Sequence, residues 1–302
     1  MRRLSGEQRP IGDYLAEMLA GLPYELVQFM LRTSVLDRLS GELCQAVTGV
    51  KRSSELLGSM AERRMLVAPL DFAGRFYRYH ALLAEYLRQR LQSQMSDEIP
   101  WLHRHAYRWY AEHGLWTEAV QHAIAVGDTE QALSWIQNCA MALVRQGDLL
   151  TLLGWVHLFP TELMRGGIVV RLAIAWGMAL AMRFRESSQL LEGIEQNAHG
   201  DTQEALRLRC ECQTIRSVAA ALKDDTAQAL RIATPCVGEE IDPWTANVAS
   251  NVARLGHWRA GDLVNFYAMP WVPYSRDEDR RNVFSTVYRL CLRAWSSYSN
   301  SG

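Results

Sequence analysis

The first third of the chain alternates short amphipathic helical patterns with one strand-like stretch. Apolar residues recur at intervals of three and four, which predicts helices at residues 13–21, 23–32, 41–47, 53–63 and 80–94. Residues 64–70 and 75–79 flank the loop Asp71-Phe72-Ala73-Gly74 and predict a β-hairpin. Short helices, a hairpin and a closing helix follow the order of a winged-helix domain, which we expect over residues 1–97.

From residue 98 onward the pattern is helical, and turn signals recur at a nearly constant spacing. The turn signals lie at Gly114, at Gly147, around Arg183, at Asp224 and at Gly256. They are separated by 33, 36, 41 and 32 residues, a period typical of helix-hairpin repeats. The predicted helix pairs are 101–113 with 116–126, 130–146 with 148–158, 168–183 with 187–196, 203–222 with 224–234, and 244–255 with 258–268, with a final helix at 279–297. The expected fold class is mainly α: a winged-helix domain with one β-hairpin, followed by a tetratricopeptide-like α-helical repeat superhelix over residues 98–302.

The polar run 92–98 leads into Ile99-Pro100 and predicts a joint between these two domains, because proline disfavours helix at the residue before it. The alternative is one continuous core with a kinked helix at this point. Limited proteolysis separates the two: we expect the first cleavage near residues 95–100, whereas cleavage confined to residues 270–273 would contradict the joint.

Composition and charge narrow the class of protein. The 32 basic and 33 acidic residues leave a net charge of -1, which argues against binding nucleic acid through bulk charge. The six cysteines lie mostly in apolar helical patterns, as expected of reduced thiols. The longest apolar candidate for a membrane span, residues 168–182, is interrupted by Arg171, and no secretory h-region follows the first ten residues. We therefore expect a cytoplasmic protein with no membrane partner.

Four runs of residues carry a resemblance to one known family. They are residues 4–15, residues 29–39 (FMLRTSVLDRL), residues 75–88 (RFYRYHALLAEYLR) and the pattern His103-Arg104…Trp109-Tyr110…Gly114 continuing to Ala132. These runs resemble the MalT-type, large ATP-binding LuxR-family transcriptional activators, a branch of the STAND signalling ATPases. The resemblance is close over residues 4–135 and architectural beyond them.

The resemblance implies a regulatory chain rather than an enzyme. The sequence contains no G-x-x-x-x-G-K-[ST] motif and no second helix-turn-helix after Ser296, so we expect the middle portion of such a regulator. No cofactor is expected in this chain, and ATP or ADP would be held by an ATPase domain elsewhere in the parent protein. The implied partners are that ATPase domain, a DNA-binding domain of the same parent chain, and a small-molecule inducer or a regulatory protein.

His80 is the residue that the resemblance connects with nucleotide. It ends the second predicted strand and opens a helix, a placement that resembles the Met-His-Asp-Leu motif of related STAND ATPases, whose histidine contacts the β-phosphate of ADP. Ala81 stands where the motif has aspartate. The alternative is a histidine that only caps the junction by a backbone hydrogen bond.

The concave surface of the predicted repeats is the expected effector site, because repeat stacks expose such a surface for binding. If the first helix of each pair lines the inside, the candidate ligand-binding residues are Arg171, Trp176, Arg207, Asn247, Asn251 and Arg254. The arginines would grip an anionic or hydroxylated effector and Trp176 would stack on it. Core packing of Trp176 is the alternative at that position, and a protein-docking scaffold without a small ligand is the alternative for the whole array.

Other chemistries find little support. His103 and His105, like Cys210 and Cys212, are two residues apart, which on a helix points them about 200° apart and not toward one metal ion. No G-x-S-x-G elbow occurs. Basic residues surround the predicted wing and would contact phosphates in a DNA-binding alternative, which the near-neutral charge of the domain disfavours. They are Lys51, Arg52, Arg63, Arg64, Arg75 and Arg78.

Overall fold

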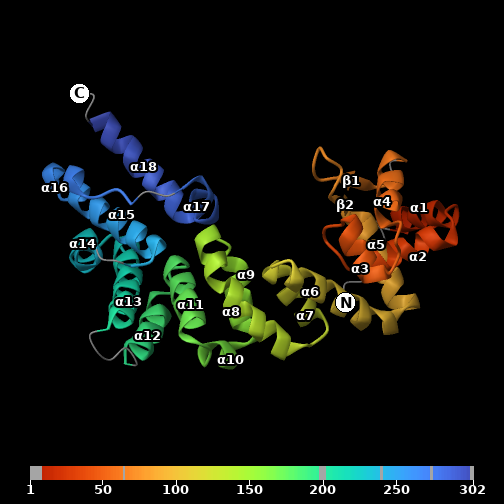
Figure 1. The fold of residues 1–302 in the computed structure, drawn as a ribbon, viewed down its shortest axis with the longest axis horizontal. Coiled ribbons are helices and arrows are strands. Elements are labelled where there is room, and N and C mark those ends of the chain that lie inside the picture. Colours follow the sequence, from red (N-terminus) through yellow and green to blue (C-terminus); the bar gives the residue numbers. More distant parts are fainter. Residues whose placement is uncertain (1–8, 64, 197–201, 239–240, 273–274, 300–302) are drawn as a thin grey trace. The chain divides into compact units, whose positions relative to one another are not determined.

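The computed structural model describes residues 9–63, 65–196, 202–238, 241–272 and 275–299 (Figure 1). Residues 4–8 of the family resemblance and Arg64 lie outside this set. The chain divides into two compact units, residues 1–135 and residues 136–302, so the boundary between them falls within helix α8 (Thr129–Gln146). The joint between two domains that the sequence predicts at residues 95–100 stays a prediction, which limited proteolysis tests.

The first unit contains the expected winged-helix order. Its elements are α1 (Arg9–Ala20), α2 (Tyr24–Thr33), α3 (Gly41–Thr48), α4 (Ser53–Glu62), β1 (Val67–Pro69), β2 (Tyr77–Tyr79) and α5 (Ala81–Gln94). The two strands are antiparallel, with Val67 opposite Tyr79 and Pro69 opposite Tyr77. Both strands are shorter than the sequence predicted, and Leu39 adds a single bridge to Tyr77 on the free side of β2.

Buried side chains of α2 and β2 hold the wing to the helices. Met30 and Leu31 are fully buried, and the Thr33 hydroxyl lies 2.7 Å from the Tyr79 hydroxyl in the interior. Burial raises the pKa of Tyr79, so its hydroxyl stays protonated and available for this hydrogen bond. The end of β2, where His80 follows, is thereby fixed to the core.

Helix pairs joined by tight turns follow the winged helix (Figure 1). In the first unit these are α6 (Ile99–Glu112) and α7 (Trp116–Ala125), which pack together. After α8 the second unit contains α9 (Leu149–Leu158), α10 (Pro160–Met164), α11 (Ile168–Leu180), α12 (Phe184–Glu195), α13 (Gln203–Leu222), α14 (Thr226–Ala233), α15 (Pro243–Arg259), α16 (Leu263–Ala268), α17 (Arg276–Arg281) and α18 (Val283–Ser299). The prediction of a mainly α fold is confirmed, while the tetratricopeptide-like superhelix stays a prediction.

The turns between paired helices depend on a left-handed residue. Gly114 and Gly147 have φ values of 69° and 81°, which glycine adopts without steric cost. Asp224 takes the same role with φ 64°. Met182, beside the turn predicted around Arg183, has φ 60°. Four of the five predicted turn positions therefore act as the sequence spacing indicated.

Two predicted boundaries are wrong. Gly256 does not end a helix, because α15 continues to Arg259 and the left-handed turn residue is Gly261. A Cβ atom at Gly256 would lie 2.7 Å from the Leu230 Cβ of α14, so this glycine allows two helices to approach closely. The predicted final helix at 279–297 is instead two helices, α17 and α18, which meet at Asn282.

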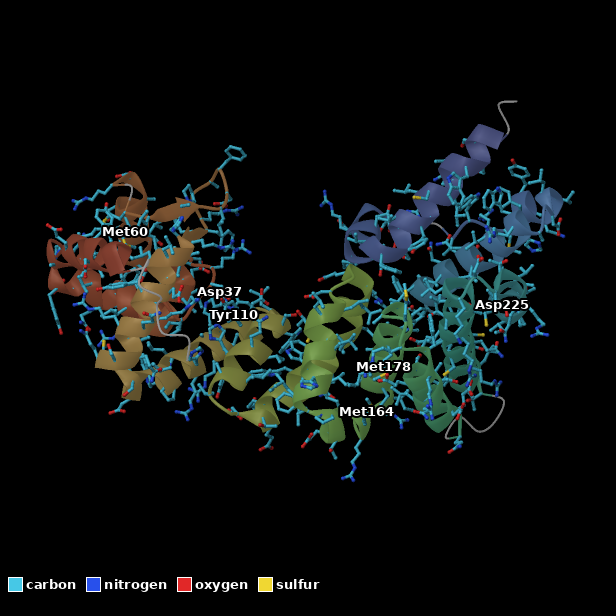
Figure 2. All side chains as sticks on the ribbon, turned by 180° about the vertical axis from the view of Figure 1, so that it is seen from behind. Asp37, Met60, Tyr110, Met164, Met178 and Asp225 are labelled. Carbon is cyan, nitrogen blue, oxygen red and sulfur yellow. The ribbon has the colours of Figure 1, made fainter. Side chains whose placement is uncertain are left out.

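Side chains fill the space between the helices in both units (Figure 2). Met60 is buried in the first unit and Met178 in the second. Helix α11 is buried along most of its length, and its small residues Ala173, Ala175 and Ala179 are fully covered by its neighbours. Among the residues that the structure describes, no helix is both long and apolar enough to cross a membrane.

Candidate functional site

His80 occupies the corner between β2 and α5. Its side chain is exposed, and its Nδ1 accepts a hydrogen bond of 3.4 Å from the Leu82 backbone N–H as the N-cap of α5. Its own backbone N–H donates to the Leu66 carbonyl at 2.7 Å. This geometry corresponds to the interpretation of His80 as a helix cap. The ring lies at the surface, and its contact with a nucleotide stays a prediction.

The basic residues around the wing are partly paired with acids. Arg52 lies 2.8 Å from Glu55, and Arg75 lies 3.2 Å from Asp71, each on its own surface segment. Lys51, Arg63 and Arg78 are exposed. This pairing is what a charge-balanced surface requires, and it reduces the positive charge available to phosphates.

In the second unit, one polar face of α15 holds the segment that follows α16. The Asn247 amide donates to the Val272 carbonyl at 3.2 Å, and the Ser250 hydroxyl donates to the Pro270 carbonyl at 2.7 Å. Arg254 donates to the carbonyls of Phe266 and Met269, both at 2.8 Å. Because side chains three, four and seven residues apart share one helix face, these residues act together on residues 266–272.

Arg254 is the most deeply buried charge of this face, with 1% of its surface exposed. Its guanidinium also stacks on the Trp271 ring, with 3.5 Å between the guanidinium carbon and the ring centroid. Burial lowers the pKa of Arg254 to about 10, which still leaves it charged at neutral pH. Arg254 therefore stabilises a loop inside the protein instead of presenting its charge to a concave surface.

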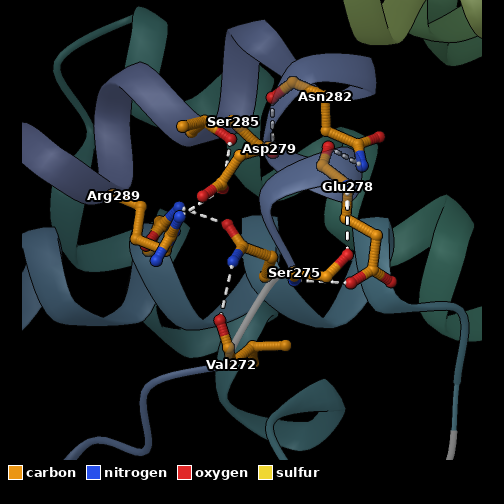
Figure 3. Close-up of polar contacts among 10 residues, drawn as sticks. Val272, Ser275, Glu278, Asp279, Asn282, Ser285 and Arg289 are labelled. Carbon is orange, nitrogen blue, oxygen red and sulfur yellow. Dashed lines mark hydrogen bonds and ion pairs between the residues drawn. The ribbon is translucent and has the colours of Figure 1, made fainter.

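A second set of polar contacts connects α17 with α18 (Figure 3). Ser275 and Glu278 form a reciprocal capping box, and the Ser275 backbone N–H holds the pKa of Glu278 below its usual value. Asp279 accepts hydrogen bonds from Thr286, at 3.0 Å, and from Arg289 of α18. The network thus fixes the beginning of α18.

The remaining candidate ligand residues are not brought together. Trp176 is 1% exposed, and its indole N–H donates to Glu211 at 3.2 Å, while its ring meets the edge of Trp244. Burial raises the pKa of Glu211, and the hydrogen bond from Trp176 opposes that shift. This position corresponds to the packing interpretation of Trp176. Arg171 is half-buried on α11, and Arg207 is exposed on α13.

The second unit contains a cavity of about 390 Å³ beneath α18. Its walls come from the C-terminal end of α11, from α13, from α15 and from α18, and they are almost entirely apolar. The lining residues are Leu180, Val218, Ala221, Leu222, Val248, Asn251, Val252, Leu255, Phe284, Ser285, Val287, Tyr288, Cys291, Leu292 and Trp295. Of the predicted ligand residues only Asn251 lines this cavity.

A sequence signal for the cavity wall existed in the last helix. Phe284, Tyr288, Cys291 and Trp295 are spaced by four, three and four residues and form one apolar stripe. Tyr288 and Trp295 remain 51% and 45% exposed, so the stripe is only partly covered. The sequence interpretation treated this helix as a cap for the repeats and did not use the stripe.

The histidine and cysteine pairs of the sequence lie apart from any shared metal position in the described residues. Within the described part of the chain, no group of three or more His, Cys, Asp or Glu side chains is arranged to hold a metal ion. His103 contacts His122 of the neighbouring helix, with their Nδ1 atoms 2.8 Å apart, while His105 contacts the Trp101 carbonyl. Cys210 and Cys212 are both buried in α13.

Fold and site together define a class of protein: a winged-helix domain continued by helix pairs that offer a ligand-sized cavity. Comparison with known proteins makes the class specific. Residues 15–99 match the MalT winged helix domain family. Residues 15–99 are thus a winged-helix domain of the MalT type, and the resemblance carried by residues 29–39 and 75–88 is confirmed.

Two kinds of relative share longer stretches with the chain. It is 30% identical over 305 residues to the serine/threonine-protein kinase PknK of Mycobacterium tuberculosis, covering 98% of this chain and 27% of the kinase. The PknK of Mycobacterium bovis matches equally. The HTH-type transcriptional regulator MalT of Cronobacter sakazakii is 30% identical over 207 residues, covering 68% of this chain and 23% of the regulator. The chain thus spans about a quarter of the length of these relatives.

Proposed function

We propose that this chain is the effector-sensing portion of an ATP-dependent, LuxR-family type of transcriptional activator that works in the cytoplasm. In this proposal the helix pairs take up a small inducer or a regulatory protein. The winged-helix domain passes the resulting change to an ATPase domain of the same parent chain, and a separate domain of that chain binds DNA. The chain itself catalyses no reaction.

The observation that carries the proposal is the pair of relatives. One is named a protein kinase and the other an HTH-type transcriptional regulator, yet they match 98% and 68% of this same chain. A module common to proteins with different named outputs is suited to receiving a signal and not to producing the output. The absence of a P-loop motif from the sequence agrees with this assignment.

His80 supports the coupling step of the proposal. Its ring is exposed at the end of the wing, where an adjoining ATPase domain could present the phosphates of ADP. An imidazole N–H beside a diphosphate forms a charge-assisted hydrogen bond, which would hold the inactive, ADP-bound state. In the full-length parent we expect His80→Ala to reduce the ADP retained through purification and to raise inducer-independent activation.

A matched variant separates this role from capping. His80→Ser keeps a good N-cap for α5 but removes the imidazole. Coupling through the ring predicts that His80→Ser behaves like His80→Ala in ADP content and basal reporter activity. Normal ADP content in both variants would leave His80 a structural residue.

A thermal-shift screen of the whole chain tests the sensing proposal. A ligand that binds only the folded state raises the melting temperature by mass action. We expect at least one small metabolite to stabilise the chain in a concentration-dependent manner. Stabilisation by protein partners alone would instead make the helix pairs a docking scaffold, which is the competing function.

A further inference from the structure

The cavity beneath α18 lies between this helix and two others with which it has little direct contact. Helix α18 packs chiefly on α15, while its apolar stripe faces α11 and α13 across the cavity. A cavity of about 390 Å³ lies in the size range of small-ligand sites. It is partly open to solvent, since Tyr288 and Trp295 of its lining are about half-exposed.

The cavity offers a ligand very little polar chemistry. Asn251 uses its amide N–H to reach Asn247 at 2.9 Å, and the Ser285 hydroxyl is directed at the Asn282 carbonyl at 3.4 Å. Tyr288 and Cys291 lie at the exposed rim. All the other lining side chains are hydrocarbon or indole. Water gains few hydrogen bonds in such a site, so an apolar occupant displaces it favourably.

We propose that the cavity between α18 and helices α11, α13 and α15 binds a compact apolar small molecule, such as an aromatic or branched aliphatic compound with at most one polar group. This inference rests on the proposed sensing function and names the ligand class. It replaces the anionic or hydroxylated effector suggested by Arg171, Arg207 and Arg254, since none of these arginines lines the cavity.

A bound molecule would join α18 to two helices that it now barely touches. Val287 and Tyr288 are half-exposed, and contact with a ligand would bury them against Val218 and Leu222 of α13. The ligand thereby fixes the position of α18 on the helix pairs. A peptide helix is a poorer occupant, because α18 already fills the helix-sized position over this surface.

The test uses the full chain and the neutral apolar dye N-phenyl-1-naphthylamine, whose fluorescence rises in apolar surroundings. We expect saturable binding of one dye per chain with a Kd on the order of 1–100 μM. Ala221→Trp places a large side chain in the cavity and should weaken dye binding at least tenfold. Val264→Trp is the matched control, because Val264 is 80% exposed on α16 and adding the same side chain there leaves the cavity open.

A second readout needs no cavity mutation. Cys291 is the one exposed cysteine of the six and lies at the cavity rim, so it should react first with iodoacetamide. Saturating dye should slow this alkylation at least fivefold in the unmodified chain. No saturable dye binding, or binding that neither Ala221→Trp nor Cys291 protection links to the cavity, would overturn the inference.

Two further outcomes of these experiments would each contradict the apolar-ligand inference in a different way. A chain that dimerises in sedimentation experiments, dissociates on Ala221→Trp and binds no dye would assign the cavity to a second copy, against the inference. If the dye fails while a polar metabolite or a protein partner raises the melting temperature, the apolar-ligand inference falls and the sensing proposal stands.

Discussion

The buried contact between His103 and His122 makes the stability of the first unit depend on pH. The two rings belong to α6 and α7, with their Nδ1 atoms 2.8 Å apart, and the His122 ring stacks on that of Tyr110, which Figure 2 labels. Burial, reinforced by His103 and Arg88 and opposed by Asp37, lowers the pKa of His122 to about 3. Burial also lowers the pKa of His103. Both rings are therefore neutral in the folded chain at neutral pH.

The size of the effect follows from proton linkage. Below pH 6.5 the unfolded chain protonates His122 and the folded chain does not, so stability falls as the pH falls through this value. At pH 5.5 the free energy of unfolding is lower by about 1.4 kcal/mol for one such histidine than it is well above pH 6.5. A folded-state pKa of about 3 lies well below pH 5.5, so the result depends mainly on the unfolded-state value. The loss continues down to the folded-state pKa.

Urea unfolding of the full chain at pH 7.5 and pH 5.5 measures this loss. We expect His122→Asn to remove about 1.4 kcal/mol of the difference between the two pH values. His113→Asn is the control, since His113 is exposed at the end of α6 in the same unit. An unchanged pH dependence in His122→Asn, or an NMR titration of the His122 ring near pH 6.5, would refute the reasoning.

Three further substitutions, one of them with a matched control, test the packing. Gly256→Ala should destabilise the second unit by about 1–3 kcal/mol in urea unfolding, because the new methyl group meets Leu230. The control is Gly154→Ala, at an open helix position, which should instead stabilise the unit by up to about 1 kcal/mol. Arg254→Met should cost about 2–4 kcal/mol and speed proteolysis within residues 269–272, since several carbonyls lose their donor. Tyr79→Phe should cost about 1 kcal/mol through the lost hydrogen bond to Thr33, and an unchanged unfolding midpoint would contradict that bond.

The order of elements could be predicted because local signals determine it. Helical periodicity and left-handed turn residues such as Gly114 and Gly147 depend only on neighbouring residues. Gly256 misled the prediction because glycine has two uses, ending a helix and allowing close approach. Only the position of α14 in the tertiary structure distinguishes these two uses of the glycine.

The candidate site was predictable to a smaller extent. The sequence predicted Asn247, Asn251 and Arg254 as ligand-binding residues. In the structure Asn247 and Arg254 donate to carbonyls of residues 266–272, which no periodicity connects with α15. The sequence allows Trp176 to be either a ring that stacks on a ligand or a core residue. The hydrogen bond from its indole N–H to Glu211, which only the structure shows, favours the core residue. The cavity depends on how far α18 stands from α11 and α13, a distance absent from any local pattern.

Amide hydrogen exchange on the full chain tests most directly the central claim that the second unit receives the signal. The compound with the largest thermal shift in the metabolite screen would be compared with buffer alone. The account predicts slower exchange in α18, at residues 283–299, and in the C-terminal turns of α13. Protection confined to the winged helix, with α18 unchanged, would contradict it.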